Sequence, residues 1–112
     1  MNFELTNKEG ITFIKVISDK ATSEIKTEFE ECLFTLIEKD KLKKIALDLT
    51  NVSFVDSSFL GSLVKGLKKT SSKMGDIKVF GLKQPVRAMF ELTRLYKVFE
   101  IFDDETDLIK SY

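Results

Sequence analysis

The sequence predicts an α/β fold in which a mixed and mostly parallel sheet of four or five strands is flanked by helices. Short apolar runs alternate with longer stretches in which apolar residues recur every three or four positions, the period of a helix. Two stretches of alternating polarity come first and are typical of a hairpin. The length of 112 residues and the composition, 43% hydrophobic and 32% charged, are typical of one globular domain. We therefore expect a single domain over residues 1–112, with its elements in the order ββαβαβαβα.

The first two strands are predicted at residues 2–7 and 11–17. Phe3 and Leu5 alternate with polar neighbours, and a second apolar stretch follows Gly10. The polar residues between the two stretches, at positions 7–10, are typical of a hairpin turn. These two strands are therefore expected to be antiparallel.

A helix is predicted next, because apolar residues recur on one face at Ile25, Phe29, Cys32, Leu33, Leu36 and Ile37. Thr22 or Ser23 is expected to cap its first N–H groups, and Glu24 lies where the helix dipole favours an anion. Cys32 is interpreted as a small core residue. Phe34 lies off this stripe, either as a flank of the core or as an exposed contact.

Three further pairs of strand and helix complete the order. The strands are predicted at residues 44–49, 77–80 and 98–102, and the helices follow Ser57-Ser58, begin at Gln84-Pro85 and start in the acidic group 103–107. Proline is tolerated at the first helical position, because its missing N–H would have no partner there. The predicted core contains Phe29, Leu33, Leu36, Ile45, Leu47, Leu49, Leu60, Val64, Val79 and Phe90.

Composition excludes several classes of site. The chain has no histidine and only Cys32 as a cysteine, which rules out Ser-His-Asp and Cys-His catalysis, a cysteine–histidine zinc site and an intrachain disulfide. Gly61 and Gly66 do not form a phosphate loop, because Leu67 stands where the lysine would be; they are expected to allow close helix packing. Eighteen basic residues balance eighteen acidic ones, so neither nucleic acid nor a membrane is an expected partner.

No cofactor and no metal are expected from these residues. The first residues lack the apolar segment of a signal peptide, and no apolar run is long enough to cross a bilayer. The chain is therefore expected to be cytoplasmic.

The candidate site is Asp56-Ser57-Ser58, at the start of the second predicted helix. On one interpretation Ser57 caps the helix and Asp56 favours its dipole. On the other, a hydroxyl at a helix start is a place where a phosphate is tolerated; both can hold at once. A catalytic pair of Asp48 and Asp56 is the weaker interpretation, because nothing in the sequence supplies a cleft. Phe59 lies beside the predicted stripe, either packed on the helix flank or displayed next to Ser57.

Residues 45–58, IALDLTNVSFVDSS, resemble the signature of the STAS domain, the sulfate-transporter and anti-sigma-factor-antagonist module. The resemblance continues through Lys78-Val79-Phe80, Pro85-Val86-Arg87 and residues 92–99, and covers nearly the whole chain. Within this family, the sequence most resembles the stand-alone bacterial anti-sigma factor antagonists. It implies a STAS-like sheet of four or five strands flanked by helices and a protein that is not an enzyme.

The resemblance also implies a phosphorylation cycle. Family members bind an anti-sigma factor that is also a serine kinase, and so release the sigma factor for transcription. The kinase phosphorylates the first serine after the aspartate, which is Ser57 here; the complex then dissociates, and a phosphatase resets the cycle. The partner-binding residues are then expected to be Asp56, Ser58, Phe59, Thr22 and Ser23. A homodimer is left open.

Two positions depart from the family pattern. Phe59 stands where glycine is common, and Thr22 stands where an acidic residue is common. A divergent STAS domain that is not phosphorylated and serves as a scaffold or oligomerisation module is therefore the alternative. A small enzyme or nucleotide-binding protein on the same fold is a third hypothesis, against which the missing phosphate loop, histidine and metal ligands count.

Overall fold

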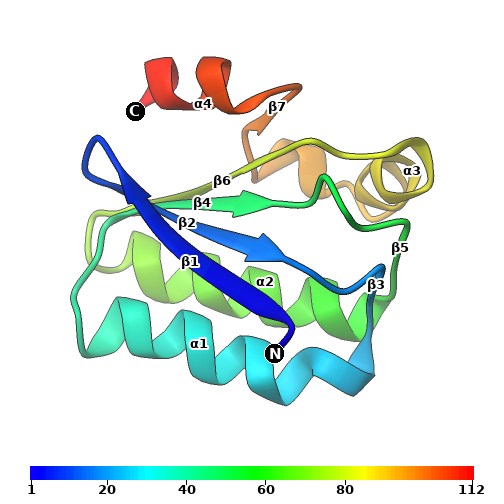
Figure 1. The fold of residues 1–112 in the computed structure, drawn as a ribbon, viewed down its shortest axis with the longest axis horizontal. Coiled ribbons are helices and arrows are strands. Elements are labelled where there is room, and N and C mark those ends of the chain that lie inside the picture. The colour runs from blue at the N-terminus through cyan, green and yellow to red at the C-terminus, as the bar shows by residue number, and fades with distance from the viewer.

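The computed structural model describes residues 1–112 and contains a five-stranded sheet with helices on both faces (Figure 1). Its strand order is β1-β2-β4-β6-β7. The strands span Phe3–Lys8 (β1), Ile11–Val16 (β2), Lys44–Asp48 (β4), Asp76–Phe80 (β6) and Ile101–Phe102 (β7). Only β1 is antiparallel to its neighbour; β2, β4, β6 and β7 are parallel. The predicted mixed and mostly parallel sheet is confirmed.

The hairpin forms where the polar residues predicted it. Phe3 pairs with Val16 at one end of β1, and Lys8 pairs with Ile11 at the other. Glu9 and Gly10 make the turn with φ of 53° and 79°, the left-handed backbone that a two-residue hairpin turn requires and that glycine adopts without strain.

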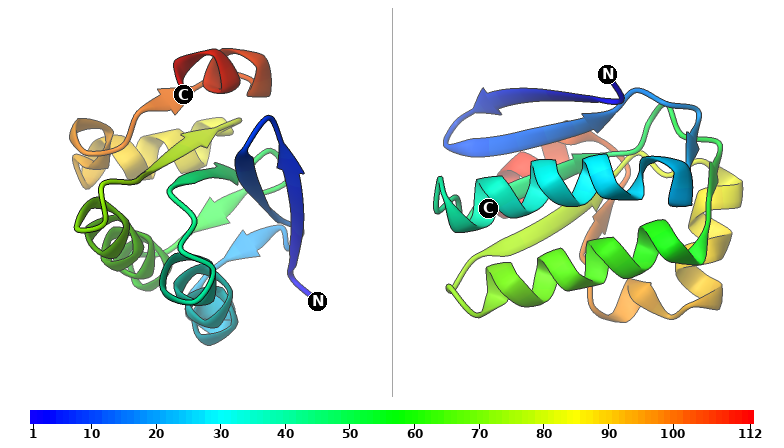
Figure 2. Two further views of the ribbon diagram at one scale, coloured as in Figure 1. Left: turned by 90° about the vertical axis from the view of Figure 1, so that its left-hand side faces the viewer. Right: turned by 90° about the horizontal axis from the view of Figure 1, so that it is seen from below.

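Four helices cover the sheet. They span Lys26–Glu38 (α1), Ser57–Ser71 (α2), Gln84–Leu92 (α3) and Glu105–Ser111 (α4). Helices α1 and α2 lie side by side against one face, and α4 crosses the other face (Figure 2). Two 3-10 turns, η1 (Ser23–Ile25) and η2 (Leu95–Lys97), precede α1 and follow α3.

The core is divided unequally between the two faces. The cluster under α1 and α2 holds 22 buried residues, whereas the cluster under α4 holds five: Ile11, Phe13, Ala46, Phe80 and Leu108. Nine of the ten predicted core residues are buried. The prediction is wrong for the tenth residue, Val64, which is only half-buried and lies at the edge of the larger cluster.

Two further strands, β3 (Lys20–Ala21) and β5 (Phe54–Val55), form a separate parallel pair that the sequence did not predict. Each has two residues, too few for a period to be recognised. They lie where the chain leaves β2 and β4, and they lead into η1 and α2 (Figure 1). The starts of these helical segments are therefore held together at one end of the sheet.

The last strand is shorter than predicted. Residues 98–102 were expected as one strand, but only Ile101 and Phe102 pair with β6. The N–H groups of Val98 and Phe99 instead donate to the carbonyl of Leu95, at 3.1 and 3.0 Å. Arg94 begins this turn with φ of 60°, so the chain closes into η2 before it extends.

Candidate functional site

The start of α2 is capped by Asp56 and not by Ser57. Asp56 has extended backbone angles, and its Oδ1 accepts the N–H of Phe59 at 2.9 Å. Ser57 is the first helical residue. The prediction that Ser57 is the cap is therefore wrong by one residue, because aspartate and serine are both favourable caps and the sequence offers them in succession.

The other oxygen of Asp56 reaches the segment before α1. Its Oδ2 accepts the N–H of Ser23 at 2.9 Å, and the N–H of Asp56 donates to the carbonyl of Ala21 at 3.2 Å. Thr22 caps η1 by accepting the N–H of Glu24 at 3.4 Å. The structure thus brings Thr22 and Ser23 next to Asp56, and Thr22 caps the turn that starts the first helical segment.

Strands β3 and β5 fix these two segments side by side. Lys20 pairs with Phe54, and Ala21 pairs with Val55. Just before them, the N–H of Ser53 donates to the carbonyl of Asp19 at 2.8 Å, and the Ser53 hydroxyl donates to its carboxylate at 2.6 Å. Residues 19–23 and 53–57 therefore form one continuous surface, which we call the switch surface.

Ser57 and Ser58 differ in exposure. The side chain of Ser57 is exposed, whereas that of Ser58 is half-buried. As the first two residues of α2, both have backbone N–H groups without an intrahelical acceptor. These N–H groups and the positive end of the helix dipole favour an anion at this position. The exposed Ser57 hydroxyl therefore lies at a position that favours negative charge.

Phe59 is not displayed beside Ser57. Its side chain is fully buried, and its ring stacks on that of Phe29 in α1 with centroids 4.5 Å apart. The prediction of Phe59 as a partner-binding residue is therefore corrected: it is a core residue joining α2 to α1. Because the ring turns inward, it leaves access to Ser57 open.

Phe54 is a surface residue that the sequence reasoning missed. Its side chain is 49% exposed, and with Lys20, Thr22 and Glu24 it lines an open depression of about 580 Å³ on the switch surface. The available signal was alternation, since Val55 is buried and its neighbour on a strand must face the other way.

The catalytic interpretation of Asp48 and Asp56 gains nothing from the structure. The carboxylate of Asp48 accepts the N–H and the hydroxyl of Thr50, at 2.9 and 2.7 Å, and so closes a turn. Both carboxylates thus accept hydrogen bonds that hold the backbone in place. No cluster of three or more acidic or cysteine side chains has the arrangement of a metal site. None of the helices has the length and apolarity needed to span a membrane.

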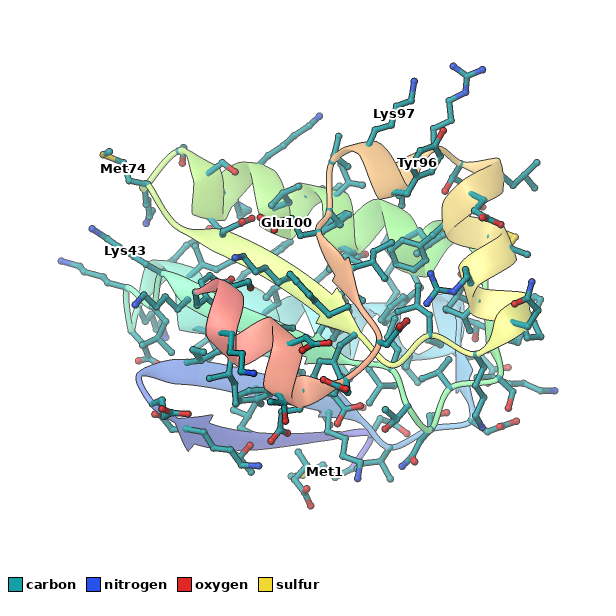
Figure 3. All side chains as sticks on the ribbon, turned by 90° about the horizontal axis from the view of Figure 1, so that it is seen from above. Met1, Lys43, Met74, Tyr96, Lys97 and Glu100 are labelled. Carbon is teal, nitrogen blue, oxygen red and sulfur yellow. The ribbon has the colours of Figure 1, made fainter.

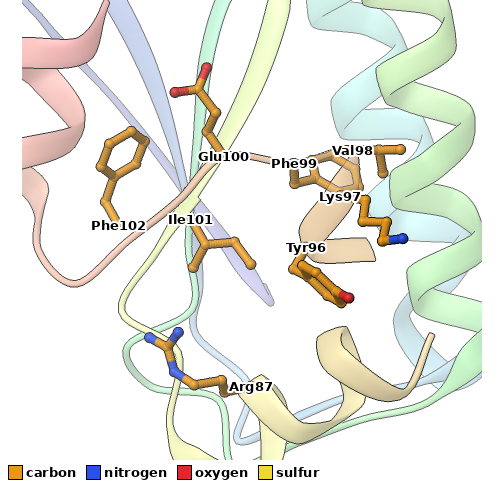
Figure 4. A pocket seen from close by; sticks show the side chains of 8 residues that line it. All are labelled: Arg87, Tyr96, Lys97, Val98, Phe99, Glu100, Ile101 and Phe102. Atoms are coloured by element: carbon orange, nitrogen blue, oxygen red, sulfur yellow. The ribbon is translucent and has the colours of Figure 1, made fainter. Parts of the chain in front are cut away.

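A second hollow lies away from the switch surface, between α3 and β7 (Figure 4). It has a volume of about 450 Å³, and five of its eight lining residues are hydrophobic, among them Tyr96 and Ile101. Its guanidinium, from Arg87, lies 3.3 Å from the Asp103 carboxylate. None of the predicted site residues lines it.

Comparison with known proteins identifies the family of this chain. The sequence model of the STAS domain matches residues 2–108. The anti-sigma F factor antagonist of Paenibacillus polymyxa is 25% identical over 112 residues, which cover 97% of this chain and 92% of that protein.

Solved structures share the fold. The anti-sigma factor antagonist of Mycobacterium paratuberculosis superimposes with a TM-score of 0.87 at 20% identity, covering 97% of this chain and 91% of that one. The Bacillus protein SpoIIAA is known unphosphorylated and phosphorylated, and both forms give a TM-score of 0.75. Their identities to this chain are 14% and 15%; the first match covers 97% of this chain and 94% of that one, the second 98% and 99%.

Proposed function

Because the chain belongs to the STAS domain family, we propose that it is a bacterial anti-sigma factor antagonist: it binds an anti-sigma factor with serine kinase activity, and phosphorylation of Ser57 ends that binding. A phosphatase then removes the phosphate and restores the binding form. This cycle runs in the cytoplasm and regulates transcription by a sigma factor. The chain itself acts as a binding module, without catalytic residues or a cofactor.

The observation that carries this proposal is the position of Ser57. It is the exposed first residue of a 15-residue helix, directly after the capping Asp56. A kinase can reach its hydroxyl without unfolding the helix. Ser58 is less suited, because its side chain is half-buried. Phe59 does not obstruct the approach, because its ring is buried against Phe29.

The switch is electrostatic. Phosphorylation adds a charge of about −1.5 to −2 at neutral pH. In the free chain this charge is solvated and faces the positive end of the α2 dipole, so the fold tolerates it. In a docked complex the phosphate would be desolvated next to the carboxylate of Asp56, a penalty that removes several kcal/mol, roughly 2–5, of binding free energy.

The switch surface supplies the partner contacts. Asp56 and Ser58 flank Ser57 in the chain, and Thr22 and Ser23 lie next to Asp56, because Asp56 accepts the Ser23 N–H and the two segments pair through β3 and β5. Phe54 adds a half-exposed aromatic ring at the edge of this surface. Buried aromatic side chains surrounded by polar groups often carry much of the energy of an interface.

Phosphate mapping tests the proposal. The purified chain is incubated with the serine-kinase anti-sigma factor of its own organism and ATP, and the modified residue is located by mass spectrometry. Phosphate on Ser57 is expected, with Ser57→Ala unmodified and Ser58→Ala still modified. Binding of the unmodified chain without phosphate on either serine would instead favour a scaffold or oligomerisation module.

Binding measurements with two variants complete the test. Ser57→Asp is expected to weaken binding to the kinase at least tenfold while leaving the thermal midpoint nearly unchanged, since an anion at a helix start is favourable. Ser57→Ala is expected to bind and to resist release by ATP. Its effect on stability is small, because Asp56 and not Ser57 provides the cap. Equal affinity of the two variants would contradict the switch.

A further inference from the structure

The balanced net charge of the chain hides a local segregation of charge. Five exposed lysines gather at the end of the sheet opposite the switch surface: Lys39, Lys41, Lys43, Lys44 and Lys73. They belong to the segment from the end of α1 to the first residue of β4 and to the turn after α2. Together with the exposed Met74 we call them the basic end.

The fold places these two segments side by side. The N–H of Asp76 donates to the carbonyl of Lys43 at 2.8 Å, and Lys44 pairs with Asp76 where β4 and β6 begin. Gly75 packs against the backbone of Lys43 so closely that a β-carbon would have no room. In Figure 3 the side chains of Lys43 and Met74 project from the same end of the molecule.

The lysines of the basic end form no ion pairs. None of the five forms an ion pair within 4 Å, although the chain contains four such pairs elsewhere. The nearby carboxylate of Glu38 is taken by Lys69 at 2.8 Å, and that of Asp76 accepts the N–H of Ile77 at 2.8 Å. Asp40, which is exposed in the same loop, and Asp76 offset part of the charge, so the five lysines leave a net positive charge at the basic end.

Helix dipoles explain only a part of this arrangement. Both α1 and α2 end here, and cations near their last carbonyls are stabilising. That effect falls off within the last turn of a helix, which includes the cap residue Lys39 but not Lys41, Lys43 and Lys44. These three remain available for an anionic partner.

Met74 points to the kind of partner. Its side chain is 89% exposed at the tip of the turn, between Lys73 and Gly75. Its φ is +64°, a conformation in which a glycine would be easier to place. An apolar side chain surrounded by lysines matches the boundary between lipid headgroups and acyl chains. A nucleic acid would be better served by exposed aromatic rings between the lysines, and the basic end has none.

We propose that the basic end binds reversibly to the surface of membranes rich in anionic phospholipids, with the lysines on the headgroups and Met74 inserted at their boundary with the acyl chains. Each lysine near such a surface strengthens binding by roughly fivefold. Ser57 and the basic end lie at opposite ends of α2, about 21 Å apart along its axis. The switch surface therefore stays free for its partner, and this proposal does not depend on the proposed function.

Vesicle cosedimentation tests the proposal with the full chain. Vesicles of phosphatidylcholine with about one third phosphatidylglycerol are expected to bind the chain at low salt, binding is expected to weaken at higher salt, and vesicles of phosphatidylcholine alone are expected not to bind it. The triple variant Lys41→Gln, Lys43→Gln, Lys73→Gln should lose at least tenfold in affinity. The matched control Lys20→Gln, Lys83→Gln, Lys97→Gln has the same net charge and should bind like the original chain.

A second variant separates insertion from stability. Met74→Gly relieves the positive φ, so the thermal midpoint is expected to stay the same or rise, whereas vesicle affinity is expected to fall. Equal losses in the basic-end and control triple variants would overturn the proposal, as would no binding to anionic vesicles. Tighter binding to a DNA duplex than to anionic vesicles at the same salt would assign the basic end to nucleic acid instead and would also overturn it.

Discussion

The carboxylate of Asp56 and the backbone N–H of Ser23 form a hydrogen bond of 2.9 Å between residues 33 positions apart. The same carboxylate caps α2 through its other oxygen, which accepts the N–H of Phe59 at 2.9 Å. One side chain therefore sets the start of the helix that carries Ser57 and the position of the segment before α1. The switch surface depends on this double use of Asp56.

Substitution of Asp56 separates its two roles. Asp56→Asn keeps one side-chain oxygen, which can still accept the N–H of Phe59 and cap α2. Its NH₂ group is a donor and cannot accept the N–H of Ser23, so only that contact is lost. We expect Asp56→Asn to change the unfolding free energy little and to shift the amide resonance of Ser23. Asp56→Ala removes both contacts and is expected to cost about 1–2 kcal/mol in urea unfolding. Equal stability of Asp56→Ala and the original chain would contradict the cap.

Two phenylalanines five residues apart are expected to respond in opposite ways. Phe59→Ala empties a buried site beside Phe29 and should destabilise the chain by about 3–5 kcal/mol. Phe54→Ala removes a half-exposed ring and should leave the unfolding free energy nearly unchanged while weakening binding to the anti-sigma factor. Urea unfolding and titration calorimetry measure the two effects. A strongly destabilised Phe54→Ala would show that this ring supports the fold.

Gly61 and Gly66, both in α2, provide a matched pair. A β-carbon on Gly66 would overlap the side chain of Leu33 in α1, whereas one on Gly61 would meet nothing within 4 Å. Close packing, expected for both glycines, therefore holds only for Gly66. Gly61→Ala should stabilise the chain by about 1 kcal/mol through helix propensity. Gly66→Ala should destabilise it by about 1–3 kcal/mol, because overpacking outweighs that gain. A stabilised Gly66→Ala would show that Leu33 moves aside freely.

Tyr112 is expected to make stability depend on alkaline pH. Its hydroxyl oxygen lies 2.7 Å from the carbonyl oxygens of Ile45 and Asp76, which share its single proton, and accepts the N–H of Ile45 at 3.2 Å. Burial, and then the charge of Asp76, raise the pKa of this phenol above its ordinary value of 10.0. Below pH 10 the phenol is neutral in the folded and in the unfolded chain, so its contribution to the unfolding free energy is constant. Above pH 10 it ionises in the unfolded chain first, so stability falls as the pH rises.

Urea unfolding between pH 8 and 11 measures this effect. The original chain should lose stability more steeply above pH 10 than Tyr112→Phe, which lacks the phenol. At pH 8 the variant should be less stable by about 1–2 kcal/mol, because carbonyl groups lose their donor. Parallel pH profiles for the two proteins would show that Tyr112 ionises alike in both states.

The sequence predicted the features that depend on long periods or on a distinctive turn. The hairpin at Gly10, the four helices and the order of the longer elements along the chain follow from such signals, and so does the place of Ser57 near a helix start. The structure revealed what depends on contacts between distant segments. Phe59 is buried because α2 packs against both the sheet and α1, which widens its buried face beyond one stripe. Val98 is exposed because Arg94 turns the chain.

The basic end shows a similar limit. Composition gives only the sum of the charges, and that sum is zero. The lysines after α1 and after α2 are some 30 residues apart in the chain and meet only because β4 and β6 are neighbours. Their gathering at one end of the molecule is a property of the fold, and the net charge of the chain does not show it.

The small size of the β3–β5 pair has a consequence for motion. These strands contribute two residues each and lie outside the five-stranded sheet, so they can separate while that sheet stays intact. Openings of this kind cost less free energy than global unfolding and appear in hydrogen exchange as a group of amides with common, low protection. Residues 19–23 and 53–56 are expected to form such a cooperative unit. The segment preceding Ser57 then has the freedom to adapt its backbone to the active site of a kinase, while the helix that follows remains folded.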